Sequence, residues 1–342
     1  MSLHPTDRLG DSRQKIRPPF ALDPSMCFYS PQANRDALSH PRVAAWIDFL
    51  THEWQPPKGQ GTRVALLIPC TKSKPYATSR EHRAINGALL AAGWEPSGTG
   101  DAPEELYQAL DTGEDRALLH NGPLRKGSMS LDRIVVSEPL GMVPYPFIYS
   151  WHGEQSPATS YDDPGLFEGR GTSVSPERAD STAVDAGGGK WRWGPNERAA
   201  FVDVHNRLVD VIADTLERVR DRYAAIGAWV SPGLTHRSFL AGAEFRRAEG
   251  LPRAKRGPRG PIQLRGVLDR TPGLVTIMPT AAQLAVAKRD LGKRLARTQR
   301  SATPGAVRAV YARGDGNDTP LGLPEVLRHL TGWLEEVRTS AG

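Results

Sequence analysis

The sequence predicts an α/β protein with a mainly parallel central sheet, because buried strands alternate with polar loops and a helix. The aliphatic run 64–68 stops at Pro69, as expected of a strand that is buried on both faces of a parallel sheet. The run 133–137 has the same character and also ends in a polar loop. The capping-box spacing of Thr78 and Glu81 predicts a helix between these two strands. Loops that leave neighbouring parallel strands meet at one edge of the sheet, where α/β proteins bind ligands.

Hydrophobic periodicity and turn residues place the remaining elements. We expect a mobile N-terminal segment (1–25), a helix over 34–49, the strand at 64–68, a helix from 79 to 93 and the strand at 133–137. A long loop (155–192) and a helix over 196–223 follow. The last expected elements are strands at 226–230 and 274–278, a helix over 281–297 and a helix from 324. The core then spans 26–300, and 301–342 forms a linker and a terminal helix. The long loop exceeds an ordinary connection, so we expect a functional lid or partial disorder.

Composition indicates a soluble protein without a cysteine framework. Among 342 residues, 39% are hydrophobic and 24% are charged, which is ordinary for a globular chain. No apolar run is long enough to cross a bilayer and no signal-peptide core is present, so we expect a cytoplasmic protein without membrane contact. Cys27 and Cys70 have neither CxxC spacing nor a histidine cluster, so we expect no disulfide, metal or cofactor. The net charge of +6 is compatible with a polyanionic partner.

The loop after the first strand is dense in reactive side chains. Cys70 begins it, and the ammonium groups of Lys72 and Lys74, with the amino end of the next helix, would favour a thiolate. A cysteine after a buried strand is also often a small core residue. Likewise, Tyr76 could cover the edge of the sheet and His82 could be an ordinary helix-surface residue. The concentration of functional groups in one turn favours a site.

A motif of the form P-C-x3-K-P-Y-x2-S-x2-H is complete in this loop. Its members are Pro69, Cys70, Lys74, Pro75, Tyr76, Ser79 and His82. The motif resembles the signature of the core domain of archaeosine synthase, a paralogue of tRNA-guanine transglycosylase. Further similar stretches lie on both sides of the motif, in the family's order. Upstream is His40 to Val43 with Trp46; downstream are Arg133 to Pro144, then Tyr161 and Asp162 with Gly169 and Gly171, and Trp193 with Glu197. The resemblance spans roughly residues 30 to 235. Two domains of the family, a transglycosylase-like barrel and a PUA-type RNA-binding domain, have no counterpart in this sequence.

The resemblance implies a three-layer α/β/α sandwich similar to uracil-DNA glycosylase. It also implies addition of an amine to the nitrile of 7-cyano-7-deazaguanine in a nucleic acid, which gives an amidine-type product. The acceptor would be tRNA or, as stand-alone bacterial and phage relatives suggest, DNA, and the amine donor would be lysine, glutamine or ammonia. Either Cys70 attacks the nitrile to form a thioimidate, or the amine adds directly while Lys74, Tyr76 or His82 handles protons.

The expected site residues follow from the motif and from the loops after the other strands. We expect catalytic roles for Cys70, Lys74, Tyr76, Ser79 and His82, and substrate binding by Pro69, Lys72, Ser137, Glu138, Gly141, Tyr161 and Asp162. Glu138 could be an acid, a base, an amine anchor or a surface carboxylate, and Asp162 could bind the exocyclic amine of a guanine-like base. After the strand at 226–230, His236 or Arg237 could reach a phosphate or the reacting group.

A basic segment over 245–265 favours a nucleic-acid partner. It carries Arg246, Arg247, Arg253, Lys255, Arg256 and Arg259 among prolines and glycines. A flexible loop of this kind suits contact with a phosphate backbone, although a solvated basic loop is the alternative. Two further function classes stay open: a glycosylase-like enzyme that acts on the base–sugar bond, and a nucleic-acid-binding module without catalysis.

Overall fold

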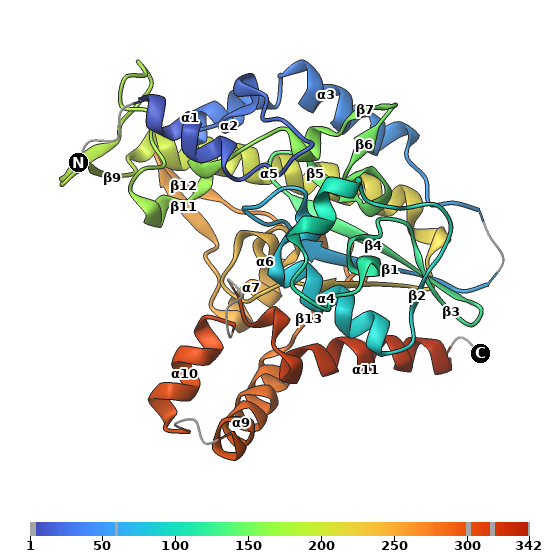
Figure 1. Cartoon of the computed structure of the whole chain (residues 1–342). Helices are drawn as coiled ribbons and strands as arrows, with labels where there is room; N and C mark the ends of the chain where they lie inside the picture. Colours follow the sequence, from blue (N-terminus) through green and yellow to red (C-terminus); the bar gives the residue numbers. More distant parts are fainter. Residues whose placement is uncertain (1–4, 59–60, 299–301, 315–318, 341–342) are drawn as a thin grey trace.

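The computed structural model describes residues 5–58, 61–298, 302–314 and 319–340, and it shows a mixed α/β fold around one mostly parallel sheet (Figure 1). Within these residues the sheet has seven strands in the order β13-β10-β1-β4-β3-β2, with β5 also paired to β4. They are β1 (Arg63–Pro69), β2 (Glu95–Pro96), β3 (Leu124–Lys126), β4 (Met129–Ser137), β5 (Gly141–Pro144), β10 (Ala225–Trp229) and β13 (Thr276–Met278). Strands β13, β10, β1 and β4 are parallel, as predicted, whereas β2, β3 and β5 pair antiparallel.

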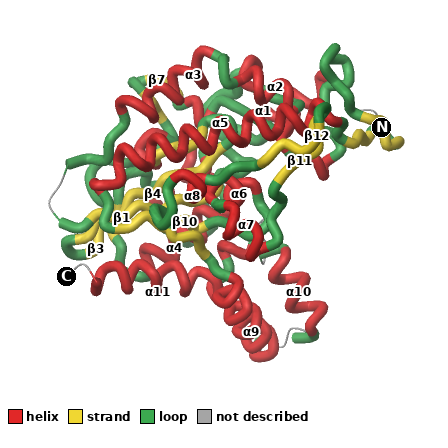
Figure 2. Tube along the Cα trace, turned by 180° about the vertical axis from the view of Figure 1, so that it is seen from behind, coloured by secondary structure: helices red, strands yellow, loops and turns green. Residues whose placement is uncertain are grey.

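Helices cover both faces of the sheet, so the fold has three layers (Figures 1 and 2). One face carries α1 (Pro5–Arg13), α2 (Pro31–Ala37), α3 (Pro41–Asp48) and α5 (Pro195–Val219). The other carries α4 (Arg80–Ala91) and α11 (Pro324–Ser340), with α9 (Ala281–Arg297) against α11 and α10 (Pro304–Ala312) against α9. The contact of α11 with the sheet is close, because a Cβ at Gly227 of β10 would overlap the Trp333 ring.

Short helices and hairpins complete the fold. They are α6 (Thr235–Leu240), α7 (Ala243–Glu249), α8 (Val267–Arg270) and three hairpins, β6 (Ser150–Trp151) with β7 (Glu154–Gln155), β8 (Val184–Gly187) with β9 (Lys190–Arg192), and β11 (Ala254–Gly257) with β12 (Gly260–Gln263). In the part of the chain that the structure describes, no helix has the length and apolar character needed to cross a membrane.

Helix α4 begins one residue later than predicted. Its cap is Ser79, whose hydroxyl oxygen accepts a hydrogen bond from the backbone N–H of His82. Thr78 instead donates its hydroxyl to the carbonyl oxygen of Pro75. The predicted capping box of Thr78 and Glu81 is therefore wrong, although the helix itself is confirmed.

The helix predicted over 34–49 is divided into α2 and α3. Pro41 has no N–H to donate within a continuing helix, but its fixed φ suits the first position of a new one. His40 caps that new helix by accepting a hydrogen bond from the backbone of Arg42. The predicted element is thus present with a break that proline explains.

Both terminal segments belong to the packed fold, which differs from the predicted mobile segment and linker. Residues 5–25 include α1 and lie against the motif loop, where Ile16 forms a parallel bridge with Lys74. The backbone N–H of Arg17 donates to the Lys74 carbonyl at 2.8 Å. At the other end, 302–314 and 319–340 supply α10 and α11, and Leu330 and Leu334 of α11 are buried. The N-terminal segment therefore helps to build the site.

Candidate active site

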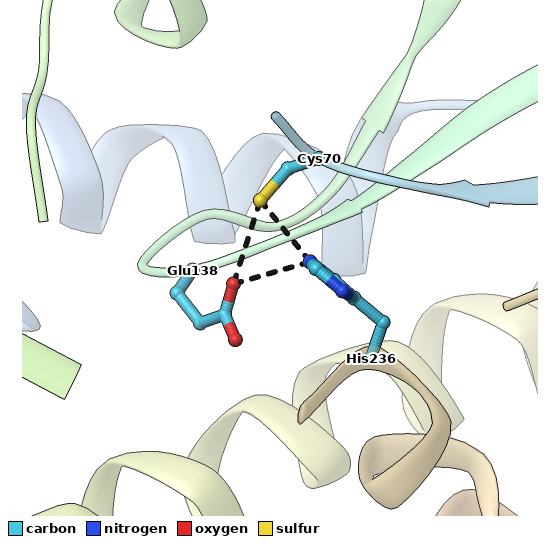
Figure 3. Close-up of side chains that lie close together, drawn as sticks. All are labelled: Cys70, Glu138 and His236. Carbon is cyan, nitrogen blue, oxygen red and sulfur yellow. Dashed lines mark hydrogen bonds and ion pairs between the residues drawn. The ribbon is translucent and has the colours of Figure 1, made fainter. Parts of the chain in front are cut away.

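Three side chains converge where the parallel strands end (Figure 3). Cys70 follows β1, Glu138 follows β4, and His236 lies on α6 after β10, so three neighbouring strands contribute. The Sγ of Cys70 is 3.1 Å from Nε2 of His236 and 3.6 Å from Oε2 of Glu138. The His236 and Glu138 atoms are 3.5 Å apart. The predicted meeting of three loops is present, and the position of His236 after a strand was its only sequence signal.

Burial and mutual charge determine the protonation of this cluster. Burial alone would lower the pKa of His236, but its interactions with Cys70 and Glu138 outweigh burial and raise that pKa well above 6.5. Burial opposes ionisation of Glu138, yet the charge of His236 prevails and the pKa of Glu138 is lowered. Burial raises the pKa of the Cys70 thiol, although His236 opposes this. These shifts favour an ionised Glu138, a protonated His236 and a protonated Cys70 thiol, and the basic group beside the sulfur is His236 instead of the predicted Lys72 or Lys74.

A cavity of about 620 Å³ opens beside Cys70. Its wall includes the predicted residues Pro69, Cys70, Lys72, Lys74, Ser79 and Asp162, together with His236. Other parts of the wall come from the N-terminal segment and the long loop, with Lys15, Arg17, Asp163, Pro164, Phe167 and Arg170. Glu138, predicted to bind substrate, is 1% exposed and outside the wall, where it lies behind Cys70 and His236. The long loop thus closes one side of the cavity, as a lid would.

Three buried hydroxyl groups hold the motif loop in place. Tyr76, Ser137 and Tyr161 have no exposed surface, and their hydroxyl oxygens lie 2.7 to 3.0 Å from one another. The Lys74 ammonium lies 4.2 Å from the centre of the Tyr161 ring. Contrary to the prediction, Tyr76, Ser137 and Tyr161 do not belong to the cavity wall. They join the motif loop, the end of β4 and the long loop.

His82 also supports the motif loop from outside the cavity. Its Nε2 lies 2.8 Å from the carbonyl oxygen of Pro69, and its Nδ1 lies 2.8 Å from the hydroxyl of Tyr145. The ring has no exposed surface, and burial lowers its pKa to about 4, so it is neutral and donates from Nε2 to Pro69. Contrary to the prediction, His82 is not at the cavity, and its contacts position the loop that carries Cys70.

Gly141 was predicted to bind substrate, but it instead provides a backbone conformation that the chain needs. It begins β5 with φ +75°, a conformation that favours glycine. A Cβ there would approach Val211 of α5 to 3.0 Å, and Gly141 is not part of the cavity wall. Its role is the tight connection between β4 and β5.

The carboxylate that is left without a partner is Asp163, not the predicted Asp162. Asp162 accepts hydrogen bonds from Ser12 at 2.6 Å and from Lys15 at 2.5 Å. Asp163 is 7% exposed, belongs to the cavity wall, and has an Oδ2 atom without a hydrogen-bond partner among the described residues. Burial raises the pKa of Asp163 from 3.8 to about 7, although the Lys74 charge opposes this. A donor on a bound ligand would satisfy Asp163, and nothing in the sequence separates the two adjacent aspartates.

Only part of the basic segment is available to a partner. In place of a flexible loop, the structure has α7 and the β11–β12 hairpin. Arg246 is 1% exposed and donates to the backbone carbonyls of Ser238, Ala241, Pro252 and Arg265, so its predicted contact with nucleic acid is wrong. Lys255 is paired with Glu168 at 2.8 Å. The predicted residues with exposed side chains are Arg247, Arg253, Arg256 and Arg259.

We expect Arg246→Ala to lower the free energy of unfolding by at least about 3 kcal/mol, because several buried carbonyl groups lose their donor at once. Arg256→Ala on the neighbouring hairpin is the control and should change it by less than about 0.5 kcal/mol. Urea unfolding followed by circular dichroism measures both. Equal stability of the two variants would show that Arg246 does not hold this region together.

Comparison with known proteins identifies no relative. No protein-family model matches the chain, and neither the curated proteins nor the solved structures contain a match. The function therefore has to be inferred from the geometry of the cavity and its residues, and the resemblance to archaeosine synthase remains a hypothesis.

Proposed function

We propose that the protein is an archaeosine-synthase-like enzyme with a uracil-DNA glycosylase-like core, and that it adds an amine to the nitrile of 7-cyano-7-deazaguanine in DNA or tRNA. The observation that carries this proposal is the Cys70 sulfur, which lines the cavity beside His236 and Glu138. A nitrile carbon needs a nucleophile, and its nitrogen needs a proton. A thiol beside an imidazolium offers both.

In the first step, Sγ of Cys70 bonds to the nitrile carbon and one C–N π bond breaks. The nitrile nitrogen takes a proton from Nε2 of His236, and the thiol proton passes to Glu138, which lies within 3.6 Å of the sulfur. Transfer of that proton from Glu138 to His236 then restores both charges, across a separation of 3.5 Å. The product of this step is a thioimidate on Cys70, with the former His236 proton on the nitrile nitrogen and the former thiol proton on His236.

In the second step, the amine attacks the thioimidate carbon and the C–S bond breaks. One amine proton moves to the sulfur, so that Cys70 leaves as a thiol and the amidine is released. A donor such as lysine or ammonia arrives as an ammonium ion and must first lose a proton, which Asp163 in the cavity wall can accept and return to solvent. Direct addition of the amine, with Cys70 as a bystander, is the competing mechanism.

A nucleic-acid acceptor is supported by the charges around the cavity. Arg17, Arg80 and Arg170 belong to its wall. The β11–β12 hairpin contacts the long loop next to the cavity, because Lys255 of the hairpin forms an ion pair with Glu168, two residues before the wall residue Arg170. The exposed arginines of this hairpin and its flank, Arg253, Arg256 and Arg259, would add phosphate contacts next to the cavity.

We expect a variant with Arg253, Arg256 and Arg259 all changed to alanine to bind DNA and tRNA more weakly. The slope of log affinity against log salt should fall by about 0.9 for each phosphate contact that is lost. Fluorescence anisotropy at several salt concentrations measures this slope, and Arg308→Ala on α10 is a control at a distant exposed site. An unchanged slope would contradict a backbone contact by the hairpin.

Mass spectrometry of nucleosides tests the proposed reaction. The purified protein is incubated with DNA or tRNA that contains 7-cyano-7-deazaguanine, and with isotopically labelled lysine, glutamine or ammonium. The expected product is a nucleoside whose mass equals that of the nitrile plus the whole amine. Absence of this product with every acceptor and donor overturns the proposal. Release of the free base would instead favour the glycosylase alternative, in which Asp163 would activate water.

A further inference from the structure

We propose that Cys70, Glu138 and His236 also bind a thiophilic divalent cation of the zinc class, and that this cation and the nitrile substrate exclude each other. Each residue offers one donor atom, and the three atoms lie within 4.8 Å of one another. Thiolate, imidazole and carboxylate are the ligands that zinc takes in proteins. The expectation of no metal rested on the absence of CxxC spacing and of a histidine cluster, whereas these three ligands lie far apart in the chain.

The separations between the donor atoms have the size of the edges of a tetrahedral zinc site. With zinc bonds of about 2.0 to 2.3 Å, the ligand atoms of such a site lie about 3.3 to 3.6 Å apart. Here they are 3.1 Å (Sγ to Nε2), 3.6 Å (Sγ to Oε2) and 3.5 Å (Nε2 to Oε2). A point about 2 Å from all three atoms therefore exists, so an ion needs little side-chain movement to be bound.

The charges balance when a dication binds. Cys70 gives its thiol proton and His236 its Nε2 proton to the buffer, which leaves a thiolate and a carboxylate to match the two positive charges. The buried cluster thus stays neutral, and an uncompensated buried charge is avoided. Cys70 and His236 both belong to the cavity wall and Glu138 is buried behind them, so the fourth position of the ion opens toward the cavity.

Two observations indicate that the ion competes with the nitrile substrate and is not a permanent part of the protein. The sulfur that would attack the nitrile is also the sulfur that would bind the metal, so the two uses cannot occur together. In addition, Nδ1 of His236 is buried without a hydrogen-bond partner among the described residues. Histidines in lasting metal centres usually donate this N–H to a carboxylate or carbonyl, which strengthens binding. Metal binding itself does not depend on the proposed reaction; only the exclusion rests on it.

Titration of the full chain with cobalt(II) tests the binding without any assay of activity. A cobalt–thiolate bond gives a charge-transfer band in the near ultraviolet, and intense visible bands indicate four-coordinate cobalt. We expect one cobalt per chain, which zinc displaces, and an unchanged spectrum in Cys27→Ser. Cys70→Ser should lose the charge-transfer band, and Glu138→Gln should weaken binding by about tenfold or more. No spectrum, or an unchanged spectrum in Cys70→Ser, overturns the proposal.

Alkylation and kinetics test the exclusion. Zinc should slow the reaction of iodoacetamide with Cys70, measured by peptide mass spectrometry, and leave the rate at Cys27 unchanged. In the amine-addition assay, zinc should raise KM for the nitrile acceptor. Equal alkylation rates with and without zinc, or activation by zinc, would overturn the exclusion. Failure of the amine-addition reaction leaves the cobalt spectrum and the alkylation rates as they are, so the two proposals are judged separately.

Discussion

Replacement of Cys70 by alanine is expected to slow amine addition by at least about 1,000-fold, which corresponds to about 4 kcal/mol of lost transition-state stabilisation. The sulfur forms the covalent bond of the proposed first step, and alanine offers no nucleophile. Cys70→Ser should be nearly as slow, because a hydroxyl group is a much poorer nucleophile near neutral pH. The single-turnover rate of amidine formation at saturating acceptor, followed by mass spectrometry, measures both effects.

Cys27→Ser is the matched control for these variants. Cys27 is also a half-buried free cysteine, but its sulfur lies 3.8 Å from the carbonyl oxygen of Asp23 and outside the cavity wall. Its rate should equal that of the parent protein, and thermal unfolding should confirm that all variants are folded. When the amine is withheld, an adduct between Cys70 and the acceptor should accumulate. Full activity in both Cys70→Ala and Cys70→Ser would rule out covalent catalysis and leave direct addition.

The part of the site that strands determine could be predicted from the sequence. An aliphatic run that ends in a polar loop defines both a buried strand and the place where it stops. Pro69 and Ser137 are therefore correctly predicted as strand ends, and β1 and β4 are adjacent and parallel. His236 follows the third strand by the same logic. The shared edge of the sheet then brings together residues that lie far apart in the chain.

Which side chains face the cavity could not be predicted, because that depends on partners distant in the chain. Tyr76 and His82 follow the same strand as Cys70, but they turn toward Ser137 and Tyr145, respectively, in the packed interior. The sequence predicts that Arg246 is an exposed cation, but its guanidinium group is buried among backbone carbonyl groups that come from other segments. No local pattern of residue types reveals such pairings, since each one requires two segments to be folded against each other.

The Asp163→Asn variant is expected to be more stable than the parent protein above pH 7, by up to about 4 kcal/mol, and equally stable near pH 3. Burial raises the pKa of Asp163 from 3.8 to about 7, so the folded state holds this proton more tightly than the unfolded chain. The parent therefore loses stability as the pH rises from about 4 to about 7, and the loss stays constant above that range. Asparagine resembles the protonated acid and avoids the loss. The charged groups around Asp163 are Lys15, Lys74, Glu138 and Asp162.

Urea unfolding between pH 3 and pH 8 measures this difference, with Asp162→Asn as the control. Asp162 is paired with Lys15 and Ser12, so its replacement should destabilise the protein at pH 8, where Asp163→Asn stabilises it. A destabilised Asp163→Asn at pH 8 would show that the carboxylate has a partner in the folded state. Amine addition by the same variant should be slower, since the acceptor for the ammonium proton is lost. A variant with greater stability and lower activity would show that the Asp163 carboxylate acts on a ligand and does not stabilise the fold.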